Sequence, residues 1–160
     1  MSAALEKVKE LSKSGKYPVI IDTMGELCES DVARELGHND FYLYHVNTYE
    51  TCKRIIFMGV RGIPEKLRPR CAYVISNLRY LTSDRVMAIA NGLDPEPVKV
   101  AVPGELPGQA EVITVSEEIP DMLGCMKLRK DLLGTISEAR KVGIEVYIME
   151  GGHDNAVNVR

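Results

Sequence analysis

The segment YPVIID, residues 17–22, carries apolar side chains at successive positions, and this pattern predicts a strand buried on both faces. Three further segments have the length and composition of strands: FYLYHV (41–46), CAYVIS (71–76) and IEVYIM (144–149). Segments with helical periodicity separate them. This alternation predicts an α/β fold, a three-layer sandwich with a mainly parallel central sheet.

Two other segments, residues 97–102 and 110–116, alternate at period two and predict one antiparallel hairpin. A long helix is expected to follow, over residues 116–142. Its interior glycines, Gly124 and Gly134, each cost about 1 kcal/mol relative to alanine, and they indicate a kink, a helix boundary or a close backbone approach. We expect residues 1–150 to form a single α/β domain and residues 151–160 to be a mobile tail.

One helix in the middle of the chain is predicted from its ends. Asn47 with Glu50 has the spacing of a capping box and would begin the helix, while Gly59 would end it. Residues 59–70 contain two prolines and several bases, and they predict an exposed basic loop.

The composition restricts the class of protein. No apolar run approaches the roughly 20 residues that a membrane-spanning helix needs, and the N-terminal residues mix acids with lysines, so we expect a cytoplasmic protein without membrane contact. The four cysteines form no Cys-x-x-Cys pair, which argues against a disulfide framework and favours buried thiols. A zinc site would require the fold to gather them, and no metal is assigned.

The charge is distributed unevenly along the chain. The whole chain has a net charge of −3, yet residues 53–85 carry eight bases against Glu65 and Asp84. An acidic chain is an unusual nucleic-acid binder, so a localised anion site is favoured over an extended groove for RNA.

The ends of the predicted strands supply the candidate site. In open parallel sheets, ligands bind outside the carboxyl ends of the strands. Arginine forks bind phosphate or carboxylate, and amide side chains add hydrogen bonds. The predicted ligand-binding residues are therefore Asn47, Arg61, Asn77 and Arg79.

Asp22 and His153 are the candidate catalytic residues. Asp22 ends the first strand, and His153 follows two glycines and precedes an aspartate, an arrangement suited to acid–base chemistry. The alternatives are a turn-forming carboxylate and a disordered terminus. His45, inside a strand, is interpreted as a packed, hydrogen-bonded residue. A strand ending in Asp-Thr resembles the first strand of haloacid-dehalogenase-type phosphatases, but Met24 occupies the position of their second aspartate.

Three functions remain open at this level. The favoured one is binding of a small anionic ligand, with phosphate as the favoured group, in a protein that could be a small transferase or lyase. The second is a non-catalytic subunit or assembly partner, either a homo-oligomer or a protein that binds another. The third and weakest is RNA binding through residues 53–85.

Overall fold

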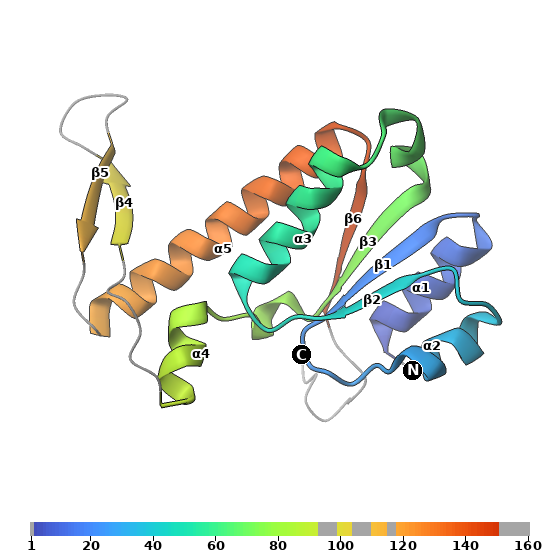
Figure 1. Cartoon of the computed structure of the whole chain (residues 1–160), viewed down its shortest axis with the longest axis horizontal. Coiled ribbons are helices and arrows are strands. Elements are labelled where there is room, and N and C mark those ends of the chain that lie inside the picture. Colours follow the sequence, from blue (N-terminus) through green and yellow to red (C-terminus); the bar gives the residue numbers. More distant parts are fainter. Residues whose placement is uncertain (1, 93–98, 104–109, 115–117, 151–160) are drawn as a thin grey trace.

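The computed structural model describes residues 2–92, 99–103, 110–114 and 118–150, and it describes residues 99–103, 110–114 and 118–125 by their backbone alone. Four strands form one wholly parallel sheet in the order β2-β1-β3-β6 (Figure 1). These strands are β1 (Tyr17–Asp22), β2 (Tyr42–His45), β3 (Cys71–Ser76) and β6 (Glu145–Met149). The prediction of a mixed α/β fold is confirmed, and the four-stranded sheet contains no antiparallel strand.

Two helices pack on one face of this sheet: α1 (Ala3–Lys13) and α2 (Glu29–Leu36). Their apolar residues meet the strand side chains that point to this face, as Val8, Val32 and Ile20 do, each fully buried. The Ser2 hydroxyl caps α1 by accepting a hydrogen bond from the Leu5 N–H at 3.1 Å. The first helix therefore forms as its sequence pattern predicts.

The other face is covered by α3 (Tyr49–Gly62) and α5 (Glu118–Lys141), and the C-terminal part of α5 packs against α3 (Figure 1). Ile56 and Ile136 are buried here against Ile21 of β1. The helix α5 is continuous through Gly134, so Gly134 marks neither a helix boundary nor a close backbone approach.

Both predicted ends of the middle helix are wrong. Thr48, not Asn47, is the N-cap of α3, and its hydroxyl accepts from the Thr51 N–H at 3.3 Å. The Glu50 carboxylate accepts instead from the Asp84 N–H at 3.1 Å, which ties α3 to the start of α4 (Asp84–Ala90). Gly59 lies inside α3, which continues to Gly62, and at Gly59 the helix packs so closely against Tyr73 of β3 that a Cβ would clash with it.

The remaining elements are short. The predicted loop of residues 59–70 contains the short 3-10 helix η1 (Glu65–Arg70), and η2 (Leu78–Tyr80) follows β3. β4 (Lys99–Pro103) and β5 (Ala110–Thr114) pair antiparallel with each other in a separate two-stranded sheet. This sheet lies at the N-terminal end of α5 (Figure 1). None of the described helices is long and apolar enough to cross a membrane.

Candidate ligand site at the carboxyl edge of the sheet

The loops after β1 and β3 leave the sheet in opposite directions. The chain after β1 enters α2 on one face, whereas the chain after β3 leads to α5 on the other face. β1 and β3 are neighbours, and Asp22 is in register with Ser76. Adjacent strands with diverging loops form the topological switch point at which open α/β sheets bind ligands.

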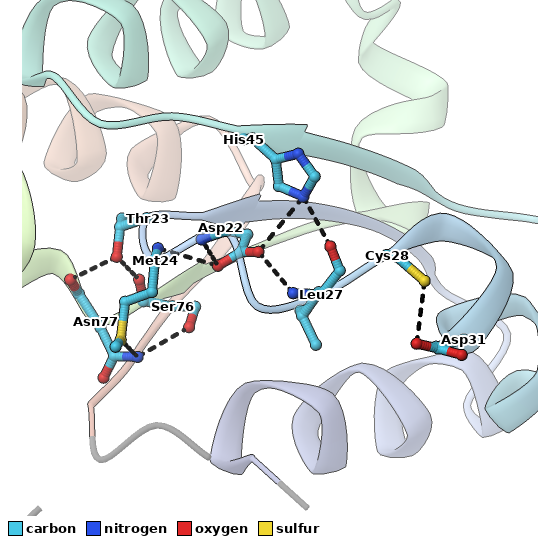
Figure 2. Close-up of polar contacts among 10 residues, drawn as sticks. Asp22, Thr23, Met24, Leu27, Cys28, Asp31, His45, Ser76 and Asn77 are labelled. Atoms are coloured by element: carbon cyan, nitrogen blue, oxygen red, sulfur yellow. Dashed lines mark hydrogen bonds and ion pairs between the residues drawn. The ribbon is translucent and has the colours of Figure 1, made fainter. Parts of the chain in front are cut away.

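Asp22 ends β1 with a fully buried carboxylate. Its Oδ1 accepts hydrogen bonds from the backbone N–H groups of Met24 and Gly25, both at 3.1 Å, and its Oδ2 accepts one from Leu27 at 2.9 Å (Figure 2). Gly25 has a φ of +72°, which lets the chain fold back over the carboxylate. The carboxylate at the end of β1 therefore organises the turn that follows, by accepting hydrogen bonds from its backbone N–H groups.

His45 ends β2 in register with Asp22. Its Nε2 lies 2.7 Å from the Leu27 carbonyl oxygen and 3.5 Å from Asp22 Oδ2 (Figure 2). Since a carbonyl oxygen can only accept, Nε2 carries a proton and donates a hydrogen bond to the Leu27 carbonyl oxygen. The ring is hydrogen-bonded as the sequence suggested, but 55% of the side chain is exposed. It therefore joins the Asp22 turn to the edge of β2 while remaining open to solvent.

Thr23 connects β1 to β3 across the switch point. Its hydroxyl lies 2.6 Å from the Ser76 carbonyl oxygen and 2.9 Å from that of Asn77, and it donates to this pair (Figure 2). The sequence interpretation did not include Thr23 as a site residue. Its position directly after Asp22, at the predicted carboxyl edge of the sheet, was the available signal.

Asn77 is a buried positioning residue in the same junction. It has φ 57° and ψ 57°, the only positive φ among the described non-glycine residues, and asparagine tolerates this conformation better than most. Its N–H donates to the Met149 carbonyl oxygen at 2.8 Å, and its side-chain amide donates to Ser76 Oγ at 3.2 Å. The amide also lies 3.3 Å from Met24 Sδ (Figure 2). Asn77 thus holds β3, β6 and the Asp22 turn together.

Arg79 lies just beyond Asn77, on η2. Its guanidinium stacks over the Tyr80 ring at 5.0 Å, and its Nε is 3.8 Å from Glu150 Oε2. The Arg79 side chain is 44% exposed, so it can reach a ligand at this edge. Asn47 is also exposed at this edge, and its backbone carbonyl accepts from the Thr82 N–H at 3.1 Å.

The structure does not bring every predicted residue to this edge. Arg61 lies near the end of α3, and α3 runs from the carboxyl edge back towards the opposite edge of the sheet (Figure 1). His153 lies outside the described residues, so its approach to Asp22 stays a prediction. Among the described residues, no group of three or more His, Cys, Asp or Glu side chains is placed to hold a metal ion.

The described cysteines Cys28, Cys52 and Cys71 are free thiols. Cys52 lies on the buried face of α3, and burial raises the pKa of its thiol to about 12. This agrees with the expectation of buried thiols for Cys52, whereas Cys28 is exposed. In comparisons with known proteins, no family model matches the chain and no curated protein is significantly similar to it.

Proposed function

We propose that this protein binds a small anionic ligand, most simply a phosphorylated one, at the carboxyl edge of its sheet between β1 and β3. The observation that carries the proposal is the switch point, where polar residues from both strand ends converge on diverging loops. An exposed arginine beside an exposed asparagine amide suits recognition of a phosphate or carboxylate.

Arg79 and Asn47 are the proposed ligand contacts. Both are exposed, whereas Asn77 is buried and would position the loop that carries Arg79. The Glu150 carboxylate 3.8 Å from Arg79 Nε orients the guanidinium without enclosing it. An incoming phosphate would compete with this partly exposed ion pair, which is worth little by itself.

Binding is proposed as the primary role of this edge. Both carboxylate oxygens of Asp22 already accept backbone hydrogen bonds, so they stabilise the turn. A transferase or lyase step that uses Asp22 with His153 stays a prediction.

Replacing Arg79 by alanine is expected to weaken ligand binding at least about tenfold, because it removes a charge-assisted contact. The melting temperature is expected to stay nearly unchanged, since the side chain is partly exposed. Native mass spectrometry of the freshly purified protein would identify a retained ligand, and titration of that ligand into both proteins would compare affinities. Arg34→Ala, in an exposed ion pair on α2, is the matched control. Equal binding by the Arg79 and Arg34 variants would remove Arg79 from the site.

A second candidate function is that of a non-catalytic subunit that binds another protein. The observation that favours it is the exposed apolar strip beside β2, an outer strand that pairs only with β1 in the described part of the chain. Tyr42, Tyr44 and Met58 are exposed by 55%, 40% and 64%, and they border a cavity of about 340 Å³. Apolar strips and open strand edges of this kind are common in protein interfaces.

The partner function predicts association that depends on this strip. Light scattering of the purified protein is expected to give a mass above that of one chain, or a second protein is expected to copurify. Tyr44→Lys would abolish that association, because a lysine there places a charge in the contact. A strictly single-chain particle with no copurifying protein would count against the second candidate and leave the first untouched.

A further inference from the structure

A cavity lies on the outer side of the helical layer, between α3 and α5. Its volume is about 710 Å³, within the range of pockets that bind small molecules. The residues that line it come from α3 and η1 on one side and from α5 and the turn after it on the other: Lys53, Phe57, Val60, Arg61, Arg68, Lys130, Asp131, Gly134, Thr135, Glu138 and Val142.

The cavity is cationic although the chain as a whole is acidic. Four basic side chains line it, against the carboxylates of Asp131 and Glu138. Each carboxylate has a lysine partner on its own helix, Lys127 at 2.5 Å from Asp131 and Lys141 at 3.6 Å from Glu138. Both acids thus have a cationic neighbour outside the four lining bases, and the lining itself carries more bases than acids.

Two of the four bases have defined surroundings. Arg68 donates to the carbonyl oxygens of Val60 and Ile63, both at 3.2 Å, and so fixes the end of α3. The Arg61 guanidinium stacks over the Phe57 ring at 5.2 Å. Phe57 is 46% exposed, so an aromatic face and a planar cation stand together in the cavity wall.

Gly134 supplies an independent observation. It lies in the interior of α5 and lines the cavity, and a Cβ added to it would meet nothing within 4 Å. Glycine destabilises a helix interior relative to alanine, and no contact with a described residue requires glycine at this position. The glycine keeps open a space that any side chain would partly fill.

We propose that this cavity binds a nucleoside phosphate. Its phosphates would contact Lys53 and Lys130 from opposite walls, and its base would lie against the Phe57–Arg61 pair over the space that Gly134 leaves. The site is separate from the carboxyl edge of the sheet, because it lies between helices on their outer side. The free nucleotide and a nucleotide unit of single-stranded RNA share this chemistry.

Isothermal titration calorimetry at low ionic strength tests the proposal with ATP as the probe, in the presence of EDTA. We expect ATP to bind, and tripolyphosphate and adenosine each to bind at least about tenfold more weakly, because each lacks half of the recognised groups. A short oligoadenylate distinguishes the sources: tighter binding than ATP indicates a strand, and weaker binding indicates the free nucleotide.

Three variants locate the binding in the cavity. Lys53→Ala and Lys130→Ala are each expected to weaken ATP binding about fivefold, because each removes one charged contact. Gly134→Leu is expected to abolish binding by filling the cavity, and its melting temperature reports whether the helix is intact. Lys13→Ala, which removes an exposed lysine on α1, is expected to bind ATP as the unaltered protein does. Arg79→Ala reports separately whether ATP binds at the carboxyl edge of the sheet instead.

Four results would overturn the proposal. They are no binding of ATP, full binding by a folded Gly134→Leu protein, loss of binding only in Arg79→Ala, and equally tight binding of tripolyphosphate or of an acidic peptide. Loss of binding only in Arg79→Ala would place the nucleotide at the carboxyl edge. The proposal for the cavity and the proposal for the edge can therefore fail separately.

Discussion

Gly59→Ala is expected to destabilise the protein by about 2 kcal/mol, although alanine is the better helix former by about 1 kcal/mol. A Cβ at Gly59 would lie 2.0 Å from Tyr73 Oη and 2.9 Å from its Cζ. Tyr73 is only 4% exposed and sits in the core between β3 and α3, so its ring cannot swing into solvent. The added methyl group must displace the Tyr73 ring from its packed position or push α3 away from the sheet.

Urea unfolding, followed by circular dichroism, measures this cost. Gly134→Ala is the matched control, since it lies within α5 and its Cβ would enter open space, so it is expected to stabilise the protein by about 1 kcal/mol. Adding Tyr73→Phe to Gly59→Ala removes the closest atom and is expected to recover part of the loss. If Gly59→Ala and Gly134→Ala shift stability in the same direction, the close contact between α3 and β3 is not real.

The contrast between these glycines shows how far the sequence could predict the fold. Gly37 ends α2 with φ +79°, as its position after an amphipathic segment predicts. Gly59 follows an equally regular segment and was interpreted in the same way, wrongly. The difference depends on Tyr73, which is distant in sequence and packs across the interface, so no local pattern could reveal it.

The candidate site was predictable to the same extent. Parallel strands place their carboxyl ends at one edge, and this rule correctly groups Asp22, His45 and Ser76, which are in register. Arg61 was grouped with them through its position in a basic segment. Arg61 instead lines the cavity between α3 and α5, because α3 is long enough for its last turn to lie towards the opposite edge of the sheet. The distribution of charge along the sequence does not show at which edge of the sheet a basic residue lies.

Asp22→Ala is expected to have the largest effect on stability, a loss of about 4 kcal/mol. The substitution leaves the N–H groups of Met24, Gly25 and Leu27 without their acceptor, and an unsatisfied buried donor costs about 1–3 kcal/mol. Asp22→Asn is expected to lose about half as much stability, because one side-chain oxygen remains as an acceptor. In either orientation of the amide, the new NH₂ group faces other donors, either backbone N–H groups or the N–H of His45 Nε2. Asp40→Ala, an exposed carboxylate near His38, is the control.

The two substitutions at Asp22 also separate its two interpretations. If the carboxylate forms the turn, urea unfolding is expected to show a loss of stability in both variants, smaller for Asp22→Asn than for Asp22→Ala. Ligand binding at the carboxyl edge is expected to weaken as the Asp22 turn loosens. A catalytic carboxylate predicts instead that Asp22→Asn stays as stable as the unaltered protein and binds its ligand normally while turnover stops. The three backbone hydrogen bonds and the fully buried side chain favour the first result, because an acid held by the turn it organises has few lone pairs left for a substrate.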